Sequence, residues 1–178
     1  MLIERGADLT ARDGDGWIPL HFASQRGHVD VVRMLIAHGT DPTAKNNYGS
    51  TPLHFSPYWR KVDVARTLIE RGADLTSKNN AGQTPLHLAS QEGEIDVARM
   101  PIDQGVDLTA PDSDGQTPLH LALQWGRVDF ARMVIECGAD LTAQSRDEWT
   151  PLHVASEKGQ LDVACMLIER GANMTMVS

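Results

Sequence analysis

The sequence predicts an all-α solenoid of stacked helix–turn–helix units that are joined by β-hairpin fingers. Pro-Leu-His occurs five times in the 178 residues, and its histidines are spaced 33 residues apart, at His21, His54, His87, His120 and His153. Glycine and aspartate series keep the same interval, as at Gly39 and Gly72. Such a period is typical of one supersecondary unit that repeats and stacks, and a stack offers a continuous face rather than one converging catalytic site.

The first helix of each unit is expected to begin at a Thr-Pro pair. Thr is a favourable N-cap, and Pro fits the first helical position, where its missing N–H is not needed; the pairs begin at Thr51, Thr84, Thr117 and Thr150. Leu20, Phe22 and Ala23 supply the apolar stripe in the first unit. Glycines such as Gly27 and Gly126 are expected to end this helix, because a left-handed turn suits glycine.

The second helix of each unit follows at once. In the first unit Val29, Val32 and Leu35 have helical spacing. An aspartate near the start of this helix, Asp30 in the first unit, meets the positive end of the helix dipole. An arginine three residues later predicts an ion pair within the helix in four units, at Arg33, Arg66, Arg99 and Arg132.

These linked positions resemble the ankyrin repeat. The block from Gln83 to Gly115 reads QTPLHLASQEGEIDVARMPIDQGVDLTAPDSDG, with a T-P-L-H start, two helical stripes and a D-G tip. The resemblance covers the whole chain as a single domain over 1–178, with a partial repeat at 1–16 and further repeats at 17–49, 50–82, 83–115, 116–148 and 149–178. It implies that aspartates of the Gly-Ala-Asp series tie down turn backbone and that each repeated histidine hydrogen-bonds the Thr hydroxyl and backbone between units.

Composition narrows the classes of partner and compartment. The net charge is −8, from 16 basic and 24 acidic residues without a Lys/Arg cluster. Nucleic acids and anionic membranes require a basic footprint, so neither is expected as a partner, and a basic or mixed protein is favoured. Cys137 and Cys165 are expected to be free thiols, and the sequence suggests neither a signal peptide nor a membrane span. We therefore expect an intracellular protein, cytoplasmic or nuclear.

The sequence offers little support for an enzyme. Neighbouring units of a helical stack lie about 10 Å apart, whereas zinc ligands sit about 2 Å from the metal, so one ion cannot bridge two repeated histidines. No nucleophile elbow, phosphate-cradling loop or HExxH motif is present in the sequence. We therefore expect no catalytic residue, no cofactor and no metal.

The resemblance implies that a partner meets the hairpin tips and the exposed side of the first helices, the concave face. All four Trp and both Tyr fall at these positions, and both residue types are enriched among interface hot spots. The predicted partner-binding residues are Trp17, Arg26, Tyr48, Tyr58, Trp59, Gln91, Glu92, Gln124, Trp125, Trp149 and Lys158. The same register places Gln116, Asp147 and Glu157 on this face. The competing interpretation is that such a Trp only shields its neighbour, and it applies most to Trp17 and Trp149. The three phenylalanines, Phe22, Phe55 and Phe130, are expected in the core.

Four residues depart from the repeat pattern. Ile18 replaces a capping Thr. Pro57 is expected to bend the first helix of the second unit or to end it early, displacing the two aromatic residues after it. Pro101 lies inside a second helix, at a cost of about 3 kcal/mol, and Glu148 stands where the other tips have glycine. We interpret Pro101 as drift and the segment around Pro57 as functional.

The leading hypothesis is a non-catalytic protein–protein interaction scaffold. One alternative is a targeting or regulatory segment of a larger multidomain protein or enzyme, because both ends interrupt a repeat. A stand-alone enzyme with a grafted catalytic group and an engineered binder are weaker alternatives, and prolines inside helices argue against design. Terminal repeats without a polar outer side also predict end-to-end self-association.

Overall fold

The computed structural model describes residues 7–56 and 62–171, and the chain divides into two compact units, Met1–Pro85 and Leu86–Ser178. Within the described residues there are nine α-helices and one 3-10 helix, and no β-strand. The predicted all-α class is therefore confirmed. The prediction of a single domain over 1–178 remains a prediction, and each unit is described by itself.

Unit 1 is built from short antiparallel helices. Its elements are α1 (Pro19–Arg26), α2 (Val29–Ala37), the 3-10 helix η2 (Pro52–Phe55) and α3 (Val62–Glu70). Helix α1 packs against α2 and η2, and α2 packs against α3. Branched aliphatic side chains fill the space between these helices and are almost fully buried there: Leu20, Val32, Leu35, Leu53, Val64 and Leu68.

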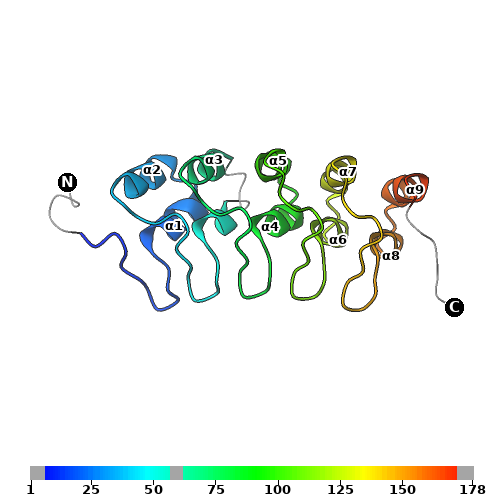
Figure 1. The fold of residues 1–178 in the computed structure, drawn as a ribbon, viewed down its shortest axis with the longest axis horizontal. Coiled ribbons are helices and arrows are strands. Elements are labelled where there is room, and N and C mark those ends of the chain that lie inside the picture. The colour runs from blue at the N-terminus through cyan, green and yellow to red at the C-terminus, as the bar shows by residue number, and fades with distance from the viewer. Residues whose placement is uncertain (1–6, 57–61, 172–178) are drawn as a thin grey trace. The chain divides into compact units, whose positions relative to one another are not determined.

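Unit 2 repeats the same helix–turn–helix arrangement. Its helices are α4 (Pro85–Glu92), α5 (Ile95–Asp103), α6 (Pro118–Gln124), α7 (Val128–Glu136), α8 (Pro151–Glu157) and α9 (Leu161–Glu169). The second helices α5, α7 and α9 form one row, and the first helices α4, α6 and α8 form another row nearer the connecting turns (Figure 1). Phe130, only 1% exposed, lies in a core shared with Leu119, Leu123, Val134 and Leu167.

The predicted helix starts and stops are confirmed. Thr51, Thr117 and Thr150 are the N-caps of η2, α6 and α8, and each is followed by Pro at the first helical position. Helix α1 ends at Gly27, whose φ of 76° lies in the left-handed region. Ile18 occupies the N-cap of α1 without a side-chain cap, yet its backbone N–H still donates to His21 Nδ1 at 3.2 Å.

The predicted ion pair within α7 is wrong. Asp129 lies in the first turn of α7 as expected, but Arg132 Nη2 lies 3.3 Å from Asp162 Oδ2 on the neighbouring helix α9. Helices α7 and α9 pack side by side, so the long arginine side chain can reach the next repeat. The pair is exposed and therefore contributes less than about 1 kcal/mol.

The connections between repeats are turns and not β-hairpins. We call residues 13–16, 46–49 and 79–82 of unit 1 and residues 112–115 and 145–148 of unit 2 the tip turns. Each is closed by a backbone hydrogen bond from its fourth residue to its first, such as Gly49 N–H to the Asn46 carbonyl at 3.0 Å. The carbonyl after each tip turn accepts from the first residue of that turn, as Ser50 O does from Asn46 N–H at 3.0 Å. Backbone bonds also join successive tip turns, as Asn80 N–H donates to Tyr48 O at 2.9 Å.

Glycine is required at two of these tips by geometry. Gly49 has a φ of 72°, and a Cβ there would lie 2.5 Å from Asn80 Oδ1. Gly115 has a φ of 74°, and a Cβ there would lie 2.8 Å from the backbone nitrogen of Arg146. Glu148 holds the same position in the last tip turn with a φ of 62°, and it is the one described non-glycine residue in this region.

The two helices in which the sequence places an internal proline differ in outcome. The first helix of the second repeat is reduced to the 3-10 turn η2, which ends at Phe55, so the predicted early end is confirmed. Pro57 itself lies outside the described residues. Helix α5 continues through the buried Pro101 to Asp103, so this proline costs a hydrogen bond without breaking the helix.

Candidate functional site

His21, His54 and His120 each tie a first helix to the chain that enters the next one. His54 Nδ1 accepts hydrogen bonds from the Thr51 backbone N–H at 3.1 Å and from the Thr51 hydroxyl at 2.9 Å. His54 Nε2 lies 3.1 Å from the Gln83 carbonyl oxygen, and His120 Nε2 lies 2.9 Å from that of Trp149. A carbonyl oxygen only accepts, so Nε2 carries the hydrogen in both rings. The structural role that the repeat implies for these histidines is confirmed.

Burial keeps these rings neutral. Desolvation lowers the pKa of His21 and of His120 below the ordinary value of 6.5, and the hydrogen bonds to the Ser50 and Trp149 carbonyls offset only part of that effect. In His120, Nδ1 accepts from Thr117 and Nε2 donates to Trp149, which leaves no ring lone pair for a metal ion or for proton transfer. Within the described ranges no group of three or more His, Cys, Asp or Glu side chains could hold a metal ion.

The aspartates of the Gly-Ala-Asp series also act on the backbone, as the repeat implies. Asp41 Oδ1 accepts from the backbone N–H of Thr43 at 2.8 Å and from its hydroxyl at 2.7 Å. Asp140 does the same with Thr142, with both distances at 2.8 Å. These carboxylates stabilise the turn after the second helix.

Unit 1 carries an aromatic cluster at its first helices. The ring centroid of Trp17 lies 4.3 Å from that of Phe55, 5.0 Å from that of Phe22 and 5.7 Å from that of His21. Phe22 is 46% exposed, so its predicted place in the core is wrong, and Phe55 is only half-buried. Two residues turn a helix by about 200°, which places Phe22 on the side of α1 away from the fully buried Leu20. The core prediction holds for Phe130.

Tyr48 projects from a tip turn of the same unit and is 56% exposed. Its hydroxyl donates to Asp15 Oδ1 of the preceding tip turn at 3.1 Å. The Asp15 carboxylate that accepts this bond raises the pKa of the Tyr48 phenol above its ordinary value. Tyr48 therefore combines an exposed ring with a hydroxyl that is held in place.

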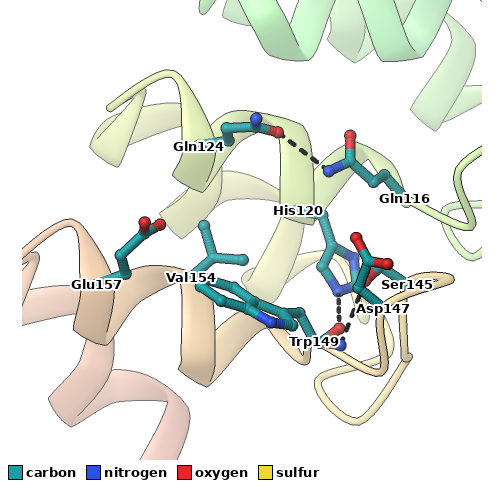
Figure 2. Close-up of a pocket in the computed structure, with 8 residues that line it drawn as sticks. All are labelled: Gln116, His120, Gln124, Ser145, Asp147, Trp149, Val154 and Glu157. Atoms are coloured by element: carbon teal, nitrogen blue, oxygen red, sulfur yellow. Dashed lines mark hydrogen bonds between the residues drawn. The ribbon is translucent and has the colours of Figure 1, made fainter.

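Unit 2 contains a cleft of about 210 Å³ between α6, the last tip turn and α8 (Figure 2). It is lined by Gln116, His120, Gln124, Ser145, Asp147, Trp149, Val154 and Glu157. Five of the eight hold positions that the repeat register assigns to the predicted binding face: Gln116, Gln124, Asp147, Trp149 and Glu157. The structure thus brings residues of two consecutive repeats into one site.

Trp149 forms one wall of this cleft and is held by its own backbone. Its carbonyl accepts from His120 Nε2 at 2.9 Å, and its N–H donates to Ser145 Oγ at 3.2 Å. The indole lies 6.3 Å from the His153 ring, centroid to centroid, and the residue remains 40% exposed. The opposite wall is polar, because Gln116 Nε2 donates to Gln124 Oε1 at 3.1 Å. A rigid aromatic surface therefore faces an amide pair.

The lining of the cleft is acidic. Asp147 and Glu157 are the acidic side chains of the lining, and burial lowers the pKa of His120, so its ring adds no positive charge. In Figure 2 the Trp149 indole lies between Glu157 on α8 and Asp147 on the tip turn. The nearby cations have their own partners: Lys158 Nζ lies 3.4 Å from Glu157 Oε2, and Arg146 Nη1 lies 3.9 Å from Asp114 Oδ1. This arrangement can accept hydrogen bonds and attract positive charge, and it contains no activated nucleophile.

The remaining predicted residues lie outside the cleft. Arg26 is exposed in the last turn of α1, and Trp125 is 57% exposed at the C-cap of α6. Gln91 and Glu92 are half-buried at the end of α4, and the Gln91 carbonyl accepts from Arg127 Nε at 2.8 Å, which gives Gln91 a packing role. Lys158 borders the cleft through its pair with Glu157.

Two predictions fall where the structure gives no description. Tyr58 and Trp59 lie outside the described residues, so their place on the binding face stays a prediction.

Sequence reasoning missed His120, Ser145 and Val154 as lining residues and Phe22 as an exposed aromatic. Ser145 could have been found, because it is aligned with Asn46, Asn79 and Asp112, whose side chains all accept from the tip-turn backbone.

Comparison with protein families agrees with this architecture. A family model described as ankyrin repeats (3 copies) matches residues 1–79 and 74–145, and the ankyrin repeat model matches residues 147–178. A search of curated proteins returns no match. Because the family models cover nearly every residue and the described helices follow the same 33-residue period, the chain belongs to the ankyrin repeat family.

Proposed function

We propose that this protein is a non-catalytic scaffold that binds a partner protein through its tip turns and the exposed sides of its first helices. Ankyrin repeats are generally protein–protein interaction modules. The tip turns, the first helices and the residues beside them expose four large aromatic side chains: Phe22 at 46%, Tyr48 at 56%, Trp125 at 57% and Trp149 at 40%. Exposed aromatic residues of this size are the commonest hot spots of protein interfaces.

The observation that carries the proposal is the exposed Trp149 indole beside the cleft, on a backbone that hydrogen bonds hold in place. Two hydrogen bonds hold its backbone while its indole stays accessible. An anchor that is already ordered loses little conformational entropy when a partner binds, so its contact area is converted more fully into affinity. A tryptophan that only shielded its neighbour would not need a cleft beside it.

The test is affinity capture with matched variants and quantitative mass spectrometry. The parent chain is compared with a Trp125→Ala/Trp149→Ala double variant and with Val31→Ala, a control truncation at a residue that is 41% exposed on the second helix α2. We expect the double variant to lose partners that Val31→Ala retains, with unchanged melting of both proteins. Equal capture by all three proteins would contradict the proposal.

A second candidate role is self-association through α9. Leu161 is 73% exposed and Ile168 is 48% exposed, although residues at the corresponding first position of α2, α5 and α7 are half-buried. Two exposed aliphatic side chains on one helix favour contact with another apolar surface. Sedimentation at increasing concentration tests this role. The mass of the parent chain should rise with concentration, and the mass of Leu161→Lys should not.

A further inference from the structure

We propose that the cleft of unit 2 receives an arginine side chain of the partner, whose guanidinium stacks on the Trp149 indole and bonds to Asp147 and Glu157. This inference rests on the proposed function and specifies the chemistry of the partner segment. It follows from the size of the cleft, its aromatic wall and its charge.

The size of the cleft suits a single side chain. Its volume of about 210 Å³ is below the about 300–1,000 Å³ typical of pockets that enclose a whole small-molecule ligand. It is open to solvent along α8, where Glu157 and the 40% exposed Trp149 border it. A long side chain from a partner backbone that runs over the tip turns can therefore enter without displacing either helix.

The aromatic wall selects a cation over a neutral apolar group. Positive charge over an indole face is attracted by the ring quadrupole, and tryptophan is the strongest such partner among the aromatic residues. The Trp149 carbonyl accepts from His120 Nε2 and the Trp149 N–H donates to Ser145 Oγ, so the backbone that carries the indole is held beside the cleft before binding. An aliphatic side chain would gain contact with Val154 but would desolvate the two carboxylates without compensation.

The two carboxylates supply the acceptors that the edge of a stacked guanidinium requires. Asp147 is exposed and, among the described residues, makes no ion pair. Glu157 pairs with Lys158, but both side chains are exposed, at 52% and 39%, so this weak pair can be exchanged for a partner cation. The Gln116–Gln124 amide pair forms a polar wall that carries no positive charge and therefore does not repel a cation.

Arginine fits this geometry better than lysine. A guanidinium is planar and carries five N–H donors in a fixed plane, so it can stack on the indole while its edge reaches carboxylates on two sides. A lysine ammonium is a compact, strongly hydrated point charge that cannot stack in this way. The net charge of −8 also favours the approach of a basic segment.

The test is NMR titration of the full chain with Nα-acetyl-arginine-N-methylamide, observed at the tryptophan indole ¹H–¹⁵N resonances. Trp149→Phe assigns the Trp149 resonance, and the Trp125 resonance is an internal control for adventitious stacking on an exposed indole. The neutral isostere Nα-acetyl-citrulline-N-methylamide and the lysine analogue are titrated in parallel. We expect a saturable shift at Trp149 with the arginine compound, at least a few-fold weaker binding of the lysine compound, and no saturation with citrulline.

Charge variants distinguish binding at the cleft carboxylates from a general effect of the negative charge of the protein. Asp147→Asn/Glu157→Gln should weaken arginine binding about tenfold at low salt, because two exposed carboxylate contacts are lost. Asp103→Asn/Glu136→Gln removes the same charge from the exposed ends of α5 and α7 and should leave binding unchanged.

Four results would overturn the assignment: an unshifted Trp149, an equal shift at Trp125, equal binding of citrulline or lysine, or full binding by the cleft variant. If Trp149 does not respond but Trp125→Ala/Trp149→Ala still loses its partner, the arginine assignment fails and the scaffold function stands. If arginine binds but that variant captures every partner, the proposed function fails instead.

Discussion

Replacing Glu148 by glycine is expected to stabilise the protein, although the change removes a side chain. Glu148 has a φ of 62°, a region that costs an ordinary residue about 1–2 kcal/mol. Glycine avoids this cost but loses about 0.5–1 kcal/mol through greater freedom in the unfolded chain. The difference predicts a gain of about 0.5–1 kcal/mol in the free energy of unfolding for Glu148→Gly.

The reverse change at the equivalent tip provides the control. Gly115 has a φ of 74°, and a Cβ there would lie 2.8 Å from Arg146 N and 3.1 Å from the Ser145 carbonyl carbon. Gly115→Ala therefore adds a clash between two tip turns to the backbone strain and should cost more than Glu148→Gly gains, about 2 kcal/mol or more.

Urea denaturation followed by circular dichroism measures both variants, with the midpoint and slope compared at fixed pH. A shift of the midpoint without a change of slope reports stability alone. The reasoning is refuted if Glu148→Gly unfolds at lower urea than the parent chain, or if Gly115→Ala is neutral.

Three further predictions concern the helices and the buried histidines. Pro101→Leu should raise the free energy of unfolding by about 1–3 kcal/mol, because it restores a helical N–H inside α5; an unchanged urea midpoint would contradict this. His120→Ala should lower the free energy of unfolding by at least about 2 kcal/mol, since it leaves the buried Thr117 N–H and the Trp149 carbonyl without their hydrogen-bond partner. His153→Ala, at the exposed equivalent position, should lower it clearly less in the same assay. Stability should also fall as pH drops below 6.5, the ordinary histidine pKa, because the unfolded chain then binds protons that folded His21 and His120, with lowered pKa values, do not. The slope is at most about 1.4 kcal/mol per pH unit for each histidine, and urea midpoints that stay constant from about pH 7 to pH 5 would exclude it.

The backbone of each repeat could be predicted from the sequence because its requirements are local. A Thr-Pro start, a glycine in the left-handed region and an Asp that accepts from a Thr two residues later each act within a few residues. This set recurs in most repeats, so helix starts and helix ends could be assigned from spacing, and the role of His120 followed from the resemblance to the ankyrin repeat.

The side-chain environments could not be predicted in the same way, because they depend on which residues the next repeat supplies. Arg132 pairs with Asp162, 30 residues further on, rather than with the aspartate three residues before it. Phe22 was expected inside but lies on the side of α1 away from the buried Leu20, where its ring packs against that of Trp17.

From the sequence alone, the period and the residue types determined the fold class and the start and end of most helices. Only the tertiary structure decided that Gln116 and Gln124 of one repeat meet Asp147, Trp149 and Glu157 of the next in one acidic, aromatic cleft. The physical reason is that backbone hydrogen bonding repeats identically in every unit, whereas the charge and shape of a surface arise from pairs of different side chains that stacking brings together.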